Sequence, residues 1–433
     1  MTISKKPKLS TMMFFQYAIW GAWLPILFPF LQDYRKFSGE QIGTMFAVGA
    51  VGALLAPFVA GQIADRFFAT QKFLGISHII GAALVWNLAD VETYSGFLWF
   101  SLAYSLVYAP TLPLSNSLAL HHLKDRDTDF AKVRVWGTVG WIVVGIAVGQ
   151  WLLLKHSPSG LSAEALKLAQ NAGRADAFRL SAIIGLVMGV YCFFLPNTPP
   201  RKGKEAFATW EALKEILGNA TLRHLFVVSL VVSCIHQFYF VHTAGFLSEF
   251  QAGIATSLNK VFGVGGGGLM TIGQMTEIAV LAIVPLFAKK YSRKTFLIVG
   301  LLAYALRMLL FSYVHVLPMP EIATLVLGVA LHGLCFGCFI FVAFMIVDEE
   351  TTADVRASAQ SLYNLVVIGI GIIVGSYVAT TLVQGWAADG EKFSYASESI
   401  TQRLFSVPMW ASLACLAYVI AFYPRHSSKA DVD

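Results

Sequence analysis

One carboxylate lies inside a mostly apolar segment of this 433-residue chain. Glu277 falls near the middle of residues 269–288, where most of the other side chains are apolar. A charge without water around it is costly, so a charged group in such a segment pairs with another group and marks a functional site. The predicted partner is Arg134, at the start of another apolar segment, and Arg307 within a third segment is the alternative.

Further polar side chains occur beside aromatic ones at helical spacing. Arg134, Thr138 and Trp141 fall at i, i+4 and i+7, which places them on one face of a helix. Three further pairs each share one helix face: Gln237 with Phe240, His332 with Phe336, and the two polar residues Gln274 and Glu277. Such a set suits a nucleoside, because a base stacks on an aromatic ring for about 1–3 kcal/mol, and amides and carboxylates hold its hydroxyls and base edges.

The composition identifies the elements that must position these residues. Hydrophobic residues make up 57% of the chain, charged residues only 13%, and the mean hydropathy is +0.66. These values lie far outside the range of soluble domains, so the chain is a polytopic membrane protein. Its loops are too short for a sensing or catalytic domain, which argues against a receptor and against an enzyme. In a membrane, helix packing is the alternative role for the polar side chains, at about 0.6 kcal/mol each.

A membrane-crossing helix needs about 20 mostly apolar residues. The chain offers twelve such segments, without the alternating ten-residue pattern of an outer-membrane barrel. We therefore predict an all-α fold with helices near 11–31, 41–62, 72–88, 96–120, 135–154, 178–196, 224–247, 267–288, 295–315, 322–346, 360–384 and 404–423.

The positions of Lys and Arg predict the orientation. Cytoplasmic loops hold the excess of these residues, and here the excess lies on the side that carries both termini. Both termini are therefore predicted to be cytoplasmic. The net charge of +6 follows from the same asymmetry and requires no nucleic-acid partner. The polar segment 1–10 leads into a first helix without a cleavage site, so we expect no cleaved signal peptide.

No metal or cofactor site is expected. Cys335 and Cys338 have C-x-x-C spacing, but no second pair completes a metal site, so packing is the preferred interpretation. His121 and His122 lack further ligands. The glycine-rich segment 263–268 is not followed by the Gly-Lys-Ser/Thr of a phosphate loop, and we expect a flexible loop.

The chain divides near its middle. A proline-rich basic stretch follows the sixth segment, and the residues after it have the apolar spacing of an amphipathic helix: Trp210, Leu213, Ile216 and Leu217. We predict an N-terminal six-helix bundle at 1–197, a cytoplasmic linker at 198–222 and a C-terminal six-helix bundle at 223–433. The halves echo each other, since short basic turns follow the second and eighth segments.

The turn after the second segment carries a first resemblance. Gly61, Asp65, Arg66 and Lys72 resemble the signature loop of the major facilitator superfamily, although its final Gly and Arg are missing. The resemblance implies two pseudo-symmetric bundles, with Asp65 and Arg66 as a latch between their cytoplasmic ends. An ordinary solvated turn is the alternative.

A narrower resemblance covers nearly the whole chain. Residues 15–24, 108–112, 134–140 and 355–360 are similar to the corresponding segments of the bacterial nucleoside:proton symporters of that superfamily. The resemblance implies that the chain imports nucleosides by proton symport. It also implies substrate contacts at Arg134, Thr138, Trp141, Gln237, Phe240, Gln274, Glu277, His332 and Phe336.

The chain departs from this family at a position tied to proton coupling. Well-studied members carry an Asp directly after the aromatic residue of the tenth helix, where this chain has Gly337 after Phe336. Where such members have Tyr and Asn, it has His332 and Phe240. Coupling then falls to Glu277, or to a histidine such as His332, whose charge changes near neutral pH.

The sequence therefore predicts a carrier in the bacterial cytoplasmic membrane that can work as a monomer, with a nucleoside and protons as its partners. A carrier of a sugar or another polar metabolite, and an uncoupled nucleoside facilitator, remain the alternatives. The identity of the nucleoside, the stoichiometry and the oligomeric state do not follow from the sequence.

Overall fold

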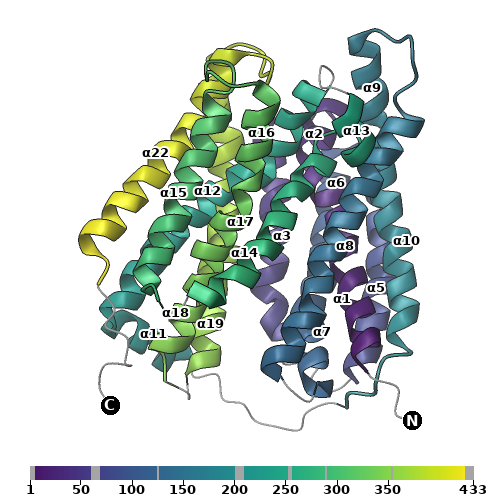
Figure 1. The fold of residues 1–433 in the computed structure, drawn as a ribbon. Coiled ribbons are helices and arrows are strands. Elements are labelled where there is room, and N and C mark those ends of the chain that lie inside the picture. Colours follow the sequence, from purple (N-terminus) through teal and green to yellow (C-terminus); the bar gives the residue numbers. More distant parts are fainter. Residues whose placement is uncertain are drawn as a thin grey trace. The chain divides into compact units, whose positions relative to one another are not determined.

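The computed structural model describes residues 5–59, 69–123, 126–199, 209–251, 256–287, 290–352 and 355–424. Every regular element in these ranges is helical, and none of the described residues forms a strand (Figure 1). The all-helical prediction is therefore confirmed for the part of the chain that the structure describes.

Ten helices among the described residues are long and apolar enough to cross a membrane. The predicted segments 41–62, described to residue 59, and 72–88 lie on helices that are not among the ten. The first lies in α3 (Gly39–Val59), whose apolar part Gly39–Leu55 is shorter. The second lies in α5 (Thr70–Leu88), which carries polar side chains such as His78 and Asn87. The chain is a multi-pass membrane protein, and the count of twelve crossings stays a prediction.

The residues group into two compact units. Unit 1 contains residues 1–204 and 242–271, and unit 2 contains residues 205–241 and 272–433. The helix α12 (Ala220–Gln251) and the helix α14 (Gly267–Phe287) each contribute to both units. The predicted three-part division at residues 198–222 remains a proposal.

Unit 1 contains the elements of the N-terminal half together with parts of α12 and α14. They are α1 (Lys6–Trp23), η1 (Leu24–Ile26), α2 (Leu27–Pro29), η2 (Phe30–Tyr34), α3, α5, α6 (Tyr94–Tyr108), α7 (Thr111–His122), α8 (Arg126–Lys155), α9 (Ala163–Gly173), α10 (Ala175–Cys192) and α13 (Thr256–Phe262). The first helix changes to 3-10 and π geometry near Pro25 and Pro29, because a proline cannot donate a helical hydrogen bond.

Within unit 1, α1 packs along α8 and α10, and α10 packs along α5 (Figure 1). Small residues allow these helices to approach closely. Gly140 of α8 lies against the backbone of Phe14 of α1, where any side chain at position 140 would collide. A hydroxyl adds a polar contact between α10 and α1, since Ser181 Oγ donates to the carbonyl of Ile19 over 2.7 Å.

The glycine-rich segment before α14 is a packed turn, so the predicted flexible loop is wrong. Gly263, Gly265 and Gly266 have positive φ angles, which residues with a side chain rarely adopt. The turn packs on α8, where the amide of Val264 donates to the carbonyl of Gly149 over 3.0 Å. The sequence suggested flexibility because glycine permits many conformations, whereas here it allows one close approach.

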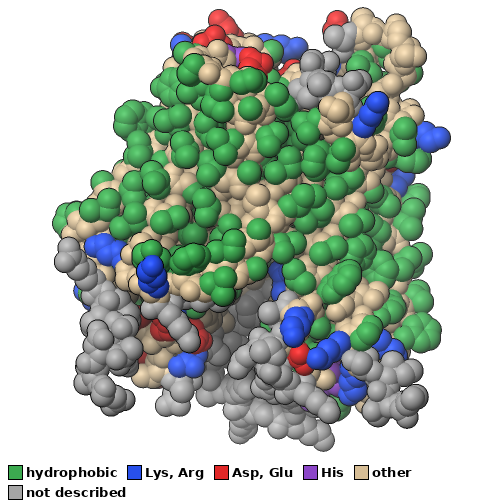
Figure 2. Space-filling view, viewed as in Figure 1, with side chains coloured by type: hydrophobic (Ala, Val, Ile, Leu, Met, Phe, Trp, Pro, Cys, Tyr) green, Lys and Arg blue, Asp and Glu red, His purple; other side chains and the backbone are tan. Residues whose placement is uncertain are grey.

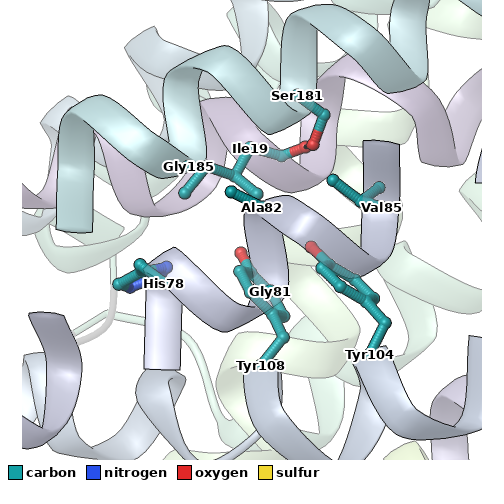
Figure 3. Close-up of a pocket in the computed structure, with 9 residues that line it drawn as sticks. All are labelled: Ile19, His78, Gly81, Ala82, Val85, Tyr104, Tyr108, Ser181 and Gly185. Atoms are coloured by element: carbon teal, nitrogen blue, oxygen red, sulfur yellow. Dashed lines mark hydrogen bonds between the residues drawn. The ribbon is translucent and has the colours of Figure 1, made fainter. Parts of the chain in front are cut away.

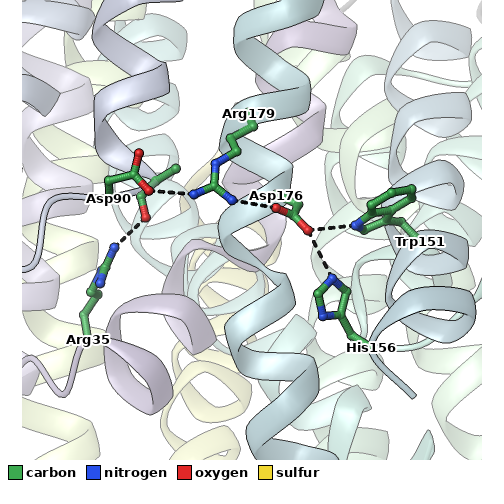
Figure 4. Close-up of polar contacts among 7 residues, drawn as sticks. Arg35, Asp90, Trp151, His156, Asp176 and Arg179 are labelled. Carbon is green, nitrogen blue, oxygen red and sulfur yellow. Dashed lines mark hydrogen bonds and ion pairs between the residues drawn. The ribbon is translucent and has the colours of Figure 1, made fainter. Parts of the chain in front are cut away.

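Polar contacts in unit 1 join the ends of α8 and α10 to each other and to the turn after α5 (Figure 4). Asp176 accepts hydrogen bonds from Arg179 (2.8 Å), from the Trp151 indole (2.9 Å) and from the His156 ring (3.1 Å). Arg179 also donates to Asp90 over 2.6 Å. One carboxylate thus holds three side chains from two helices and the loop that follows α8.

Unit 2 contains the remaining parts of α12 and α14 and the C-terminal elements. They are α11 (Thr209–Gly218), α15 (Arg293–Ser312), α16 (Glu321–Ala330), α17 (His332–Leu334), η4 (Cys335–Phe341), α18 (Val342–Glu350), α19 (Arg356–Asn364), η5 (Leu365–Ile370), α20 (Gly371–Tyr377), η6 (Val378–Val383), α21 (Gln384–Ala388) and α22 (Glu398–Phe422). The helix α15 packs against α16, η4 and α22 (Figure 1).

The predicted linker helix exists as α11, but a different face is buried. Ala212 and Ile216 are buried, whereas Trp210 and Leu217 are largely exposed. The spacing of the apolar residues therefore predicted the helix correctly and its contacts only in part.

Hydrophobic side chains cover much of the surface. On the face shown in Figure 2, hydrophobic side chains form much of the described surface and charged side chains are far fewer. Exposed large residues include Trp99 and Leu186 in unit 1 and Leu302 and Trp410 in unit 2. Lipid tails would cover such side chains, which agrees with a membrane protein.

Candidate functional site

His332 lies at the centre of a buried cluster in unit 2. The residue begins α17, which continues directly into the π-helical segment η4. Side chains from α12, α14 and α15 surround its ring. Departures from α-helical geometry are frequent at functional sites, because they redirect side chains.

Charged groups lie on both sides of the His332 ring. Nη1 of Arg307 is 3.2 Å from Nδ1, and Oε2 of Glu277 is 3.7 Å from Nε2. Arg307 is fully buried, and 13% of the Glu277 side chain is exposed. The predicted alternative partner of Glu277, Arg307, is thus separated from it by one imidazole ring.

Aromatic rings enclose the imidazole. The His332 ring stacks on Tyr239 at 4.8 Å and on His236 at 5.4 Å between ring centres. Phe336 stacks on it at 6.4 Å, and Phe240 meets it edge-on at the same distance. Three predicted site residues therefore lie around the ring of a fourth, His332: Phe240, Glu277 and Phe336.

Close packing between α14 and α17 fixes the distance from Glu277 to His332. Thr276 Oγ1 donates to the carbonyl of Ala330 over 2.7 Å and accepts from the amide of Gly333 over 3.3 Å. A side chain at Gly333 would collide with the backbone of Thr276 and Glu277. The carboxylate is thus positioned by a contact that only glycine permits.

The two predicted glutamines are buried on the same helices. Gln237 lies three residues before Phe240 on α12, and Gln274 three residues before Glu277 on α14. Oε1 of Gln274 has no hydrogen-bond partner among the described residues. An unsatisfied buried acceptor costs about 1–3 kcal/mol, so this oxygen is suited to receive a donor from a ligand or water.

The predicted residues of α8 lie in unit 1 with partners from α1. The Arg134 guanidinium sits over the Tyr17 ring at 4.0 Å, and the Trp141 ring meets Trp20 edge-on at 6.2 Å. Thr138 lies between them in sequence and is half-buried. A side chain at Gly137 would meet Tyr17, so glycine gives that ring its place beside the cation.

The predicted ion pair between Arg134 and Glu277 joins residues of different units and stays a prediction. The predicted latch residues Asp65 and Arg66 lie outside the described residues. Within the described ranges, no group of three or more His, Cys, Asp or Glu side chains could hold a metal ion.

Sequence reasoning left four aromatic residues out of the predicted site. Tyr17 and Trp20 contact the predicted residues of α8, and Tyr239 stacks on His332. Tyr304 lies beneath Arg307 and contacts His236. Tyr17 and Trp20 lie three residues apart within the segment 15–24, so their spacing could have indicated a shared helix face.

Unit 1 also holds a buried polar group away from the predicted residues. The Gln16 amide donates to Thr111 Oγ1 over 2.8 Å and its oxygen lies 3.0 Å from Nε2 of His78. The hydroxyl of Tyr108 donates to the main-chain carbonyl of Gln16 over 2.5 Å. Figure 3 shows His78, Tyr104 and Tyr108 lining a small pocket, which none of the predicted site residues lines.

Gly337 stands where the resembled family carries its coupling carboxylate. A side chain built on Gly337 would meet Cγ1 of Val280 on α14. Helix η4 therefore approaches α14 more closely than an Asp at this position would allow without a shift.

Comparisons with known proteins agree with these observations. The sequence model of a protein family described as nucleoside H+ symporter matches residues 1–427. The putative nucleoside transporter YegT of Escherichia coli strain K12 is 32% identical over 418 residues, 96% of this chain and 91% of that protein. Nucleoside permease NupG of the same strain is 27% identical over 394 residues, 89% of each chain.

A solved structure shows the same fold. The crystal structure of the nucleoside transporter NupG matches with a TM-score of 0.79 at 23% identity, covering 98% of this chain and 100% of that one.

Proposed function

Because the chain belongs to the nucleoside H+ symporter family, we propose that it imports a nucleoside together with protons across the bacterial cytoplasmic membrane. Two six-helix bundles, twelve crossings in all, alternate access to a central site. Two relatives are named as a nucleoside transporter and a nucleoside permease, which supports this substrate class.

One observation carries the proposal. The cluster around His332 places a carboxylate, an imidazole and two phenylalanine rings together within membrane-crossing helices. Ionisable groups at that depth are costly and persist where they serve substrates or protons. The ring faces suit a base, and the carboxylate suits ribose hydroxyls or a proton.

The proposed substrate site comprises the nine predicted residues. Arg134, Thr138 and Trp141 contribute from α8, Gln237 and Phe240 from α12, Gln274 and Glu277 from α14, and His332 and Phe336 from α17 and η4. Glu277 exchanges the transported proton, with His332 as the alternative. Asp65 and Arg66 form the proposed cytoplasmic latch.

An uncoupled nucleoside facilitator is the second candidate function. Gly337 favours it, because the resembled family assigns coupling to a carboxylate at this position, and any side chain there would have to displace Cγ1 of Val280. The coupled carrier is preferred because Glu277 supplies a carboxylate on the facing helix α14.

The excess of Lys and Arg on one side supports cytoplasmic termini. The proposed carrier works as a monomer within the lipid bilayer, without a cofactor and without catalysing a reaction.

The test is uptake into proteoliposomes that contain the purified protein. Labelled uridine and adenosine are supplied with and without an inward proton gradient, and unlabelled sugars serve as competitors. We expect accumulation above equilibrium that requires the gradient and is unaffected by the sugars. The variant Glu277→Gln should lose accumulation, because a neutral amide carries no exchangeable proton charge.

Equilibration of uridine without accumulation would identify the facilitator instead. Competition by a sugar together with no uptake of either nucleoside would overturn the substrate class. Full gradient-driven accumulation in Glu277→Gln would remove this carboxylate from the coupling mechanism.

A further inference from the structure

Arg307 is a charged residue for which the proposed transport cycle gives no role. The residue lies in α15, and its side chain is fully buried within unit 2. Its guanidinium sits over the rings of Tyr239 at 4.3 Å and Tyr304 at 4.9 Å. Nε and Nη2 have no hydrogen-bond partner among the described residues. A buried cation held mainly by ring faces contributes little to stability, which indicates a functional reason for its presence.

The polar contact of Arg307 with His332 fixes the position of a proton. A guanidinium can only donate hydrogen bonds, so Nδ1 of His332 must accept from Nη1. A neutral imidazole carries its single proton on the nitrogen that is not the acceptor. The proton of His332 therefore sits on Nε2, the nitrogen that faces Glu277 at 3.7 Å.

We propose that Arg307 is a positioning residue, which acts through His332 by holding its ring in the Nε2–H form and aiming that N–H at Glu277. This proposal rests on the proposed function of Glu277 and His332 in nucleoside and proton transport. It assigns proton exchange to Glu277, because His332 cannot accept a second proton at Nδ1 while Arg307 donates there. His332 serves as a fixed hydrogen-bond donor to the carboxylate.

The surroundings support one ring orientation. Tyr239 and His236 stack on the ring of His332, so it cannot turn over without displacing them. Tyr304 lies within hydrogen-bond distance of Nδ1 of His236, at 2.7 Å, and beneath the guanidinium. The groups that face His332 from the packed helices are thus Arg307 and Tyr304 of α15, Glu277 of α14, and His236 and Tyr239 of α12.

The gap between His332 and Glu277 leaves room for a change during transport. A hydrogen bond needs a separation of about 2.7–3.2 Å, whereas the two atoms are 3.7 Å apart. A rotation of the Glu277 side chain, with the backbone of α14 held in place, closes this gap when Glu277 is ionised and opens it when Glu277 is protonated. The fixed N–H thereby distinguishes the two states of the carboxylate.

The first test measures the proton position directly. Protein with isotope-labelled histidine is studied in bilayers by solid-state NMR, where the ring shifts separate the two neutral forms from the charged form. The variant His332→Gln identifies the His332 signals by their loss. We expect the Nε2–H form between about pH 5 and 8, and its replacement by a mixture in Arg307→Met. Wild-type His332 in the Nδ1–H or the charged form would overturn the proposal.

The second test measures nucleoside uptake. Arg307→Met should lower gradient-driven uptake by roughly tenfold, the effect of losing a hydrogen bond made by a charged group. Arg307→Lys should restore most of it, because an ammonium also donates to Nδ1. The exposed Arg403 serves as the matched control, and Arg403→Met should transport like the wild type.

A double-variant comparison separates positioning from general stabilisation. If Arg307 acts through His332, Arg307→Met should have little further effect in the His332→Gln background. The proposal would be contradicted if the double variant lost uptake by the product of the two single-variant factors while all variants had the same thermal stability. If the wild type moves no nucleoside, the proposed function fails, whereas the NMR result still decides the inference.

Discussion

Two arginines lie on aromatic rings, one a predicted substrate-binding residue in unit 1 and the other a residue outside that set in unit 2. Arg134 rests on Tyr17 in unit 1, and Arg307 rests on Tyr239 and Tyr304 in unit 2. Ring faces attract cations by up to about 2 kcal/mol when both are shielded from water. Neither arginine is thereby neutralised, so each keeps a charge that can attract a carboxylate or a polar substrate.

At the residue scale, we expect Trp141 to bind the base by stacking. Trp141→Ala should raise the KM for uridine uptake roughly 5- to 100-fold, which corresponds to a stacking energy of about 1–3 kcal/mol. Trp141→Phe should change it much less, because a ring remains. The exposed Trp410 provides the control Trp410→Ala. An unchanged KM in Trp141→Ala would exclude stacking at this position.

The residues that cluster around His332 were easier to predict than their contacts. Glu277 and His332 could be identified because polar residues are rare in apolar segments. The predicted pair of Arg134 with Glu277 stays a prediction. Arg307, the alternative partner suggested by the sequence, is separated from Glu277 by the ring of His332. Helical spacing predicts which residues are neighbours on one helix. The position of the His332 ring between Arg307 and Glu277 depends on how separate helices pack, which spacing does not predict.

At the scale of the elements, small residues decide how closely helices approach. Gly333 lets α17 touch α14, and Gly140 lets α8 touch α1. Lipid tails are as apolar as leucine, so close packing and polar contacts hold membrane helices together.

We therefore expect Gly333→Ala to destabilise unit 2. The added methyl group would collide with the backbone of Thr276 and Glu277, and it would increase the separation of Glu277 from His332. Gly385→Ala is the matched control, since nothing lies near a side chain at that position of α21. Thermal unfolding in detergent should show a lower Tm for Gly333→Ala and no decrease for the control. Equal Tm values would contradict the described packing.

The contacts of Asp176 lead to a second prediction at this scale. Asp176→Asn should lower the Tm by a few degrees, because its hydrogen bonds to Arg179 and His156 lose their charge at a cost of about 1–2 kcal/mol. Asp90→Asn should lower the Tm less, since Asp90 is more exposed and Arg179 keeps its ion pair with Asp176. A larger loss in Asp90→Asn would mean that the contacts of Asp176 contribute little.

The helices themselves were largely predictable, since each predicted segment is helical over most of its described residues. Apolar length is a sufficient signal because a membrane leaves the backbone few alternatives to a helix. The packed glycine turn at 263–266 and the buried face of α11 were not predictable. Both depend on tertiary contacts, with Gly149 in the first case.

At the scale of the whole molecule, the family match spans residues 1–427 and therefore both units. The proposed substrate-binding residues occur in both halves of the chain, on α8 and on α12, α14 and α17. Contributions from both halves suit a carrier that opens to each side of the membrane in turn.

The proposed orientation makes a prediction for fusion proteins. Green fluorescent protein attached after Tyr423 should fluoresce, because we expect this end in the cytoplasm. Alkaline phosphatase fused after Ser157, in the loop between α8 and α9, should be active, because that loop is expected outside. A dark fluorescent-protein fusion after Tyr423 together with an inactive phosphatase fusion after Ser157 would contradict the proposed orientation of the chain in the membrane.

The most direct measurement follows protons and nucleoside at the same time. Proteoliposomes with a pH-sensitive dye in the lumen receive uridine outside, without an imposed gradient. Symport predicts acidification of the lumen that begins with uridine entry and is absent in Glu277→Gln. Uridine entry at the wild-type rate with no change in luminal pH would contradict proton symport and leave an uncoupled carrier.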